Sequence, residues 1–77
     1  MPRAFILVNV EPGAEEQALK QLKSINGVEE SYVTYGVYDL LVRVKADTMD
    51  ELKDLVTHKI RTSKQVQSTL TLIMIEE

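Results

Sequence analysis

The chain has 77 residues, no cysteine, and 12 acidic against 9 basic residues, which give a net charge of -3. A chain of this length forms one domain with a thin core, because folding hides only about 60% of the surface that the unfolded chain exposes. The missing cysteines exclude a disulfide framework and a thiolate metal site, and the negative charge argues against direct binding of nucleic acid. No apolar run is long enough to span a bilayer and no signal segment opens the chain. We therefore predict a soluble, cytoplasmic protein that gains further burial by self-association.

The first third of the chain predicts a strand followed by a helix. Residues 4–10 (AFILVNV) are rich in β-branched and aromatic residues and too short for a typical helix, which predicts a buried strand ending at the turn EPG (11–13). From Ala14 onward, apolar residues recur at helical spacing, with charged residues on the other faces. Asn26-Gly27 is expected to end this helix, because glycine adopts the left-handed conformation that helix ends commonly require.

The middle of the chain predicts a β-hairpin. Residues 28–35 (VEESYVTY) and 38–46 (YDLLVRVKA) read as two strands. The link between them is Gly36-Val37, with Gly36 expected at a positive φ angle.

The last third predicts a second helix and a final strand. Thr48 and Glu51 match a capping box, in which each side chain satisfies a backbone amide at a helix start, and the amphipathic helix runs to about Arg61. Residues 66–75 (VQSTLTLIMI) read as a strand. The order βαββαβ predicts an α+β, ferredoxin-like domain over residues 1–77, with a four-stranded antiparallel sheet and both helices on one face.

Alternation along the strands divides the apolar residues between the two faces of this sheet. The set expected to face the helices is Ile6, Val8, Val10, Leu40, Val42, Val44, Leu70, Leu72 and Met74. The set expected on the bare face, as a dimer interface, is Phe5, Leu7, Leu41, Ile73 and Ile75. Full burial of five such side chains is worth on the order of 10 kcal/mol before the cost of association. We therefore predict a sheet-to-sheet dimer with Arg43 and Lys45 toward the rim; the alternative is a shift of register by one residue, which mixes the two faces.

The hairpin and the last strand resemble a known family. Gly36-Val37-Tyr38-Asp39 followed by LLVRV is similar to the hairpin and third strand of the Lrp/AsnC effector domain, also called the RAM domain, and residues 68–71 (STLT) are similar to its threonine-bearing last strand. The resemblance covers essentially the whole chain. It implies dimers joined through their sheets and assembled into rings, such as octamers or decamers, with a small effector, typically an amino acid, bound between dimers.

Members of this family usually carry an N-terminal helix-turn-helix DNA-binding domain. Here the first predicted strand begins three residues after Met1, so we expect a stand-alone effector domain that does not bind DNA directly. The resemblance implies a role in transcription regulation, either alone or through mixed oligomers with full-length Lrp/AsnC relatives.

The resemblance also implies an effector site between the hairpin and the last strand. Its candidate residues are Tyr35, Gly36, Tyr38, Asp39, Ser68, Thr69 and Thr71. A free amino acid needs an anionic acceptor for its ammonium, donors for its carboxylate and an apolar wall, which Asp39, the threonine hydroxyls and a tyrosine would supply. Each also has a structural interpretation: Asp commonly bonds turn amides, threonine hydroxyls can face water, and the tyrosines can pack at an interface.

Three other interpretations remain open from the sequence, one of which is a ring scaffold that binds no ligand. Residues 8–19 (VNVEPGAEEQAL) are similar to the opening of ACT domains, which share the fold and would place a ligand near Asn9, Pro12 and Gly13. A small dimeric ferredoxin-like enzyme is the other alternative. His58 is the single histidine, and the chain shows no Ser/His/Asp arrangement, phosphate loop or metal motif, so we expect no catalytic residue, cofactor or metal.

Overall fold

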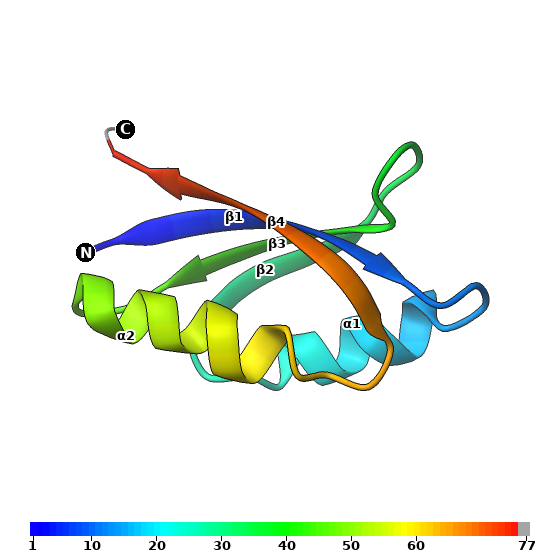
Figure 1. Cartoon of the computed structure of the whole chain (residues 1–77), viewed down its shortest axis with the longest axis horizontal. Coiled ribbons are helices and arrows are strands. Elements are labelled where there is room, and N and C mark those ends of the chain that lie inside the picture. Colours follow the sequence, from blue (N-terminus) through cyan, green and yellow to red (C-terminus); the bar gives the residue numbers. More distant parts are fainter. Residues whose placement is uncertain (76–77) are drawn as a thin grey trace.

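A computed structural model describes residues 1–75 of the chain (Figure 1). The predicted order of strands and helices is confirmed. Its elements are β1 (Arg3–Val10), α1 (Glu15–Lys23), β2 (Val28–Val33), β3 (Leu40–Lys45), α2 (Met49–Asp54) with its π-helical continuation η1 (Leu55–Ile60), and β4 (Val66–Met74). Among residues 1–75, no helix is long and apolar enough to cross a membrane.

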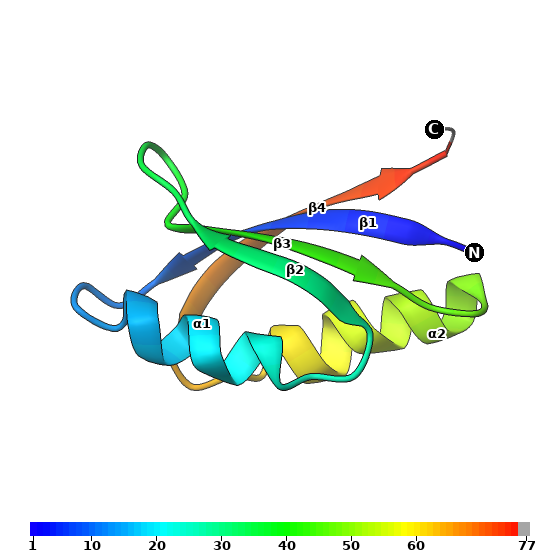
Figure 2. The ribbon, with the colours of Figure 1, turned by 180° about the vertical axis from the view of Figure 1, so that it is seen from behind.

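The four strands form one antiparallel sheet in the order β2-β3-β1-β4. Both helices lie on the same side of it, as the two opposite views show (Figures 1 and 2). The ferredoxin-like fold predicted from the sequence is therefore confirmed. We call the side of the sheet turned away from the helices the outer face.

The core lies between the helices and the alternate residues of the two central strands. Ala4, Ile6 and Val8 of β1 are fully buried, and they pair with Val44, Val42 and Leu40 of β3. Residues directly opposite each other in an antiparallel pair point to the same side, so this set faces the helices. The prediction for Ile6, Val8, Leu40, Val42 and Val44 is confirmed, and Ala4 joins them. From the other side, Leu22, Leu52 and Ile60 complete the core with no exposed surface.

The prediction of which β4 side chains face the helices is wrong. Leu72 pairs with Phe5 and Leu70 pairs with Leu7, so both leucines lie on the outer face, and Met74 shares their alternation. Ile73 pairs with the buried Ala4 and lies on the helix-facing side instead. A shift of one residue in pairing reverses every side chain of a strand, which is the alternative that the sequence had left open. Ile75 follows the last residue of β4 and is exposed.

The connection between β2 and β3 is longer than the predicted two-residue link. Residues 34–39 form a six-residue loop that projects beyond the sheet (Figure 1), because β2 ends at Val33 and β3 begins at Leu40. The positive φ angle expected for Gly36 is confirmed, at 130°.

The second helix begins as predicted and continues with wider turns. The Thr48 side chain accepts a hydrogen bond from the Glu51 backbone N–H at 3.1 Å, which satisfies one of the amides left open at the helix start. At the other end, the Arg61 N–H donates to the Val56 carbonyl at 3.2 Å. This five-residue spacing is that of a π-helix.

Gly27 holds the turn between α1 and β2 close against the end of β3. Its φ angle is 103°, and the Lys45 N–H donates to its carbonyl at 2.9 Å. A β-carbon at this position would lie 2.9 Å from Leu55 Cδ2 and 3.0 Å from the Lys45 carbonyl oxygen. The turn therefore requires glycine both for its backbone conformation and for space.

Candidate functional site

Four hydrogen bonds hold the base of the loop at residues 34–39. Thr34 donates twice, from its backbone N–H to the Asp39 carbonyl and from its hydroxyl to the Tyr38 carbonyl, each at 2.8 Å. The Asp39 N–H donates to the Val8 carbonyl at 2.9 Å, and Asp39 Oδ2 accepts from the Val10 N–H at 2.9 Å. The loop is thus tied to the end of β1, and one carboxylate oxygen of Asp39 serves the strand and not the hairpin amides that the sequence suggested.

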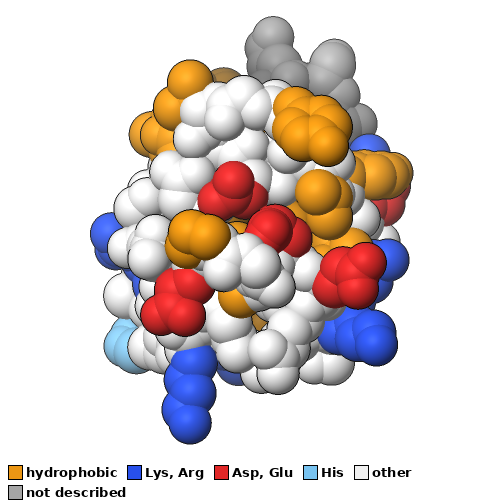
Figure 3. Space-filling model, turned by 90° about the vertical axis from the view of Figure 1, so that its right-hand side faces the viewer, with side chains coloured by type: hydrophobic (Ala, Val, Ile, Leu, Met, Phe, Trp, Pro, Cys, Tyr) orange, Lys and Arg blue, Asp and Glu red, His pale blue; other side chains and the backbone are white. Residues whose placement is uncertain are grey.

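Within residues 1–75, nothing covers the tip of the loop. The exposed fraction is 106% for Tyr35 and 84% for Val37, and a β-carbon on Gly36 would meet no atom within 4 Å. Figure 3 views the molecule from the side on which this loop lies, and shows hydrophobic side chains at the surface with acidic side chains between them. Tyr38, at the base, is half-buried. The loop therefore has a fixed base, and its tip exposes an aromatic and an apolar side chain.

The structure separates the last-strand candidates into two groups. Ser68 pairs with Asn9, and Asn9 Nδ2 donates to Ser68 Oγ at 3.2 Å on the outer face. Thr69 and Thr71 pair with Val8 and Ile6, whose side chains are buried under the helices, so their hydroxyls lie on the other side of the sheet. Ser68 is therefore near the base of the loop on the outer face, whereas the two threonines share the helix-facing side.

Two residues that hold this region together were not among the main candidates. Thr34 clamps the loop, and its signal in the sequence is weak because threonine is common in strands. Asn9 links β1 to Ser68, and its only signal was the similarity of its surroundings to ACT domains. Thr34 bonds to the Tyr38 carbonyl four residues later, and Asn9 bonds to Ser68, 59 residues later. No sequence motif identifies either partner.

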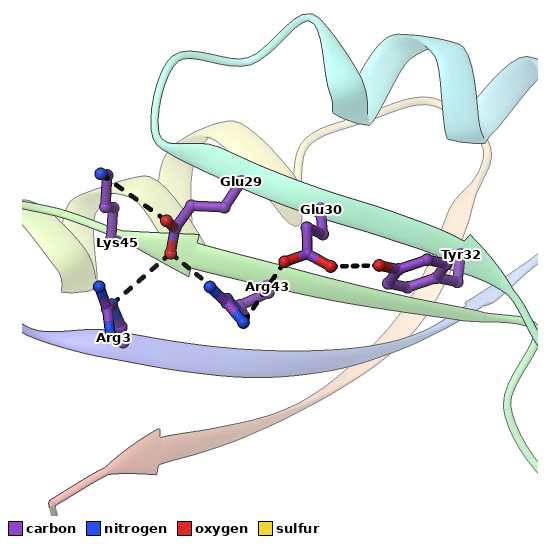
Figure 4. A network of polar contacts seen from close by, with 6 residues as sticks. All are labelled: Arg3, Glu29, Glu30, Tyr32, Arg43 and Lys45. Atoms are coloured by element: carbon purple, nitrogen blue, oxygen red, sulfur yellow. Dashed lines mark hydrogen bonds and ion pairs between the residues drawn. The ribbon is translucent and has the colours of Figure 1, made fainter. Parts of the chain in front are cut away.

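A polar network lies on the outer face, over β2, β3 and the start of β1 (Figure 4). Glu29 lies at its centre, and its carboxylate oxygens are 3.4 Å from Arg43 Nε, 3.7 Å from Arg3 Nε and 3.7 Å from Lys45 Nζ. Glu30 contacts Arg43 Nη1 at 3.4 Å. Such partly exposed pairs contribute little stability individually, but together they hold the side chains of three strands in one arrangement.

Tyr32 closes this network at the edge strand β2. Its hydroxyl donates to the Glu30 carboxylate. This hydrogen bond, with the negative charge of Glu30, raises the pKa of the Tyr32 phenol above its ordinary value. The phenol is therefore a neutral donor at physiological pH.

The outer face of β1 and β4, together with Leu41 of β3, is mostly apolar. Leu70 and Leu72 are 43% and 51% exposed, and they adjoin half-buried side chains of the central strands. We call this set the apolar patch of the outer face, and its members are Phe5, Leu7, Leu41, Leu70 and Leu72. Of the predicted interface residues, Phe5, Leu7 and Leu41 thus lie together, while Ile73 and Ile75 do not join them.

A hollow of about 570 Å³ lies at the opposite end of the sheet from the loop. It is open to solvent and lined by both acidic and basic side chains near the start of α2, among them Lys45, Asp47, Asp50, Asp54 and Lys59. His58 Nδ1 is 2.8 Å from an Asp54 oxygen, on the exposed surface of the helix. Within residues 1–75, no group of three or more His, Asp or Glu side chains is arranged to hold a metal ion.

Comparison with known proteins identifies the family. Residues 3–77 match the family described as the Lrp/AsnC ligand binding domain. The regulatory protein AsnC of Escherichia coli K12 is 37% identical over 59 residues, which are 77% of this chain and 39% of that protein. A hypothetical protein from Pyrococcus horikoshii, known from its crystal structure, is 42% identical with a TM-score of 0.92, over 100% of this chain and 93% of the other.

A transcriptional regulator of Neisseria meningitidis, crystallised as a complex with L-Met, has the same fold with a TM-score of 0.87 at 19% identity, over 99% of this chain and 51% of the other. The chain spans between 39% and 49% of the length of the curated relatives it matches. The resemblance seen in the hairpin and the last strand is confirmed over nearly the whole sequence: the chain belongs to the family of Lrp/AsnC ligand-binding domains.

Proposed function

We propose that this domain senses a small molecule, an amino acid, and couples its binding to assembly, as an effector and oligomerisation module in Lrp/AsnC transcription regulation. The observation that carries the proposal is the loop at residues 34–39, which is clamped at its base and fully exposed at its tip. The Neisseria regulator of the same fold, with its bound L-Met, supports an amino acid as the class of effector. A free amino acid in the cytoplasm is therefore the ligand that we would test first.

The effector site is completed by a second molecule of the domain. A site for a small ligand buries most of the ligand surface, and a loop tip that projects into solvent cannot provide such burial alone. Tyr35 and Tyr38 supply an apolar wall, and the open space at Gly36 lets a ligand reach the backbone. Asp39 adds negative charge for the ammonium, while its Oδ2 atom holds Val10.

On the last strand, we assign the contact with ligand to the outer-face pair Ser68 and Asn9. Their side chains offer a hydroxyl and an amide beside the loop base, and both groups donate hydrogen bonds well to a carboxylate. Thr69 and Thr71, on the helix-facing side, serve the packing of β4 in this arrangement.

The proposed dimer forms through the outer faces of two sheets. On β4, the leucines point away from the helices while Thr69 and Thr71 point toward them. In a strand that packed only against the core of its own domain, the leucines would face the helices and the threonines would face solvent. The polar network of Glu29 then borders the apolar contact, with Arg43 and Lys45 within it.

Binding between copies links the effector concentration to assembly. A ligand that contacts two copies binds the assembled state more tightly than the separated one, so it shifts the equilibrium toward assembly by mass action. A ring built from dimers has several such contacts, and joining with full-length relatives would carry the same response to a DNA-binding partner.

The proposal is tested by isothermal titration calorimetry and thermal shift with each of the twenty amino acids. We expect at least one to bind and to raise the unfolding temperature. Ser68→Ala should then weaken that binding about tenfold, the value of one hydrogen bond of about 1.4 kcal/mol. Ser63→Ala is the matched control, because it removes the same hydroxyl from the turn before β4. Absence of binding by all twenty, or equal effects of the two variants, would contradict the proposed site.

A further inference from the structure

The turn between α1 and β2 contains a chemically labile pair, Asn26-Gly27. In such a pair, the backbone nitrogen of the second residue attacks the side-chain carbonyl carbon of the asparagine, and a five-membered succinimide ring forms. Glycine hinders this attack least, because it has no β-carbon beside the attacking nitrogen. Asn26 is one of two asparagines in the chain, and the only one that a glycine follows.

The structure leaves both reacting groups accessible. The Asn26 side chain is exposed, and among residues 1–75 the Gly27 N–H has no hydrogen-bond partner. The turn is closed by the Val28 N–H, which donates to the Ile25 carbonyl at 3.2 Å. The Lys45 N–H donates to the Gly27 carbonyl at 2.9 Å, which holds that carbonyl and leaves the Gly27 nitrogen free. Local opening of this one turn therefore brings nitrogen and carbonyl carbon together without unfolding a strand or a helix.

The other asparagine, Asn9, has the opposite surroundings. It lies within β1, and its Nδ2 donates to Ser68 Oγ at 3.2 Å. The nitrogen that would attack its side chain belongs to Val10, whose N–H donates to Asp39 Oδ2 at 2.9 Å. The branched valine side chain crowds this nitrogen further. The chain thus contains its own control for the effect of the turn.

We infer that Asn26 is a site of spontaneous deamidation, which converts it to a mixture of aspartate and isoaspartate. The Gly27 nitrogen bonds to Asn26 Cγ, the bond from Cγ to Nδ2 breaks, and ammonia leaves with the proton of the Gly27 amide. Water then opens the ring at either of its two carbonyls. Opening at Cγ gives aspartate, and opening at the backbone carbonyl gives isoaspartate, in which the main chain is longer by one methylene. Water is the only co-reactant.

The two products differ in their effect on the fold. Aspartate adds a negative charge at the exposed rim of the hollow beside α2 and leaves the main chain unchanged. Isoaspartate also lengthens the turn at a place without spare room, because a β-carbon on Gly27 would lie 2.9 Å from Leu55 Cδ2 and 3.0 Å from the Lys45 carbonyl oxygen. The longer turn must move away from β3 and from Leu55, so isoaspartate destabilises the domain more than aspartate does.

Peptide mapping of the intact chain, after incubation at neutral and at mildly alkaline pH, tests the site. Trypsin cleavage after lysine and arginine places Asn26 in the peptide of residues 24–43 and Asn9 in that of residues 4–20. The first peptide should gain the mass difference between NH2 and OH and separate into two isomers. Its conversion should be at least about tenfold faster than that of Asn9, and faster at alkaline pH because the attacking nitrogen must lose its proton.

The unfolded chain and one variant complete this experiment. Asn26→Gln should abolish the conversion, because the corresponding glutamine ring has six members and forms slowly. In urea, where the strand no longer protects Asn9, the difference between the two asparagines should become smaller. An unchanged peptide of residues 24–43 from the folded chain, or equal conversion of Asn9 and Asn26 in the folded chain, would overturn the inference.

Urea unfolding at one fixed protein concentration tests the effect on the fold. The isoaspartate form, isolated by chromatography from the incubated chain, is compared with the Asn26→Asp variant, which has the same charge and an ordinary main chain. We expect the isoaspartate form to unfold at a midpoint lower by about 0.5–1 M. Equal midpoints for the two would show that the turn accepts the longer chain, and this part of the inference would be wrong.

Discussion

Replacing Gly27 by alanine should lower the free energy of unfolding strongly. The same replacement at Gly13 is the matched control, because it shows how much of the loss comes from steric crowding. Both glycines have positive φ angles, 103° and 85°, in which an L-residue loses about 1–2 kcal/mol. The surroundings differ, because a β-carbon on Gly13 would meet nothing within 4 Å, whereas one on Gly27 would lie 2.9 Å from Leu55 Cδ2 and 3.0 Å from the Lys45 carbonyl oxygen. Leu55 is buried, and the Lys45 amide is bonded to Gly27, so neither neighbour moves without disturbing the core.

The difference in unfolding free energy between the two variants gives the contribution of steric crowding at Gly27. Overpacking of a core costs about 1–3 kcal/mol, and the gain from restricting the unfolded chain is common to both alanines and cancels. We expect Gly27→Ala to lower the free energy of unfolding by about 2–5 kcal/mol and Gly13→Ala by about 1–2 kcal/mol. The assay is urea unfolding followed by circular dichroism at one fixed protein concentration, where 2 kcal/mol moves the midpoint by about 1–2 M. Equal midpoints for the two variants would refute the close approach of the turn to Leu55.

Four further changes test other parts of the structure. Leu41→Asp should convert the proposed dimer to monomer in sedimentation velocity, because two buried carboxylates would cost several kcal/mol each, while the exposed Thr57→Asp should leave the mass unchanged. Asp39→Ala should lower the free energy of unfolding by about 1–3 kcal/mol in urea unfolding, because the Val10 N–H loses its acceptor, and Asp39→Asn should cost less. Ser31→Ala should raise that free energy by about 1 kcal/mol, since the buried Ser31 hydroxyl has no hydrogen-bond partner among residues 1–75. Glu30→Gln should lower the pKa of the Tyr32 phenol toward its ordinary value in an ultraviolet absorbance titration, because the carboxylate that favours the neutral phenol is lost.

Local patterns in the sequence determined the elements, the core of the central strands and the family. The alternation in β1 and β3 predicts which residues are buried, because both strands lie in the middle of the sheet and one face of each is under the helices. The helix start at Thr48 and the positive φ angle of Gly36 depend on a few neighbouring residues, which a single stretch of sequence contains. The hairpin and last-strand motifs indicate the family for the same reason: they are short, and their order along the chain is visible.

Only the tertiary structure decided which way β4 faces and what Asp39 holds. Residues 66–75 carry apolar side chains at alternate positions of both sets, so alternation alone does not select a face. The choice is made by pairing with a strand about 60 residues away, whose register with β4 shifts between Asn9 and Val10. Asp39 likewise finds its partner, the Val10 amide, 29 residues earlier in the chain. Contacts of this kind depend on how distant segments meet in the sheet, and the local sequence contains no information about them.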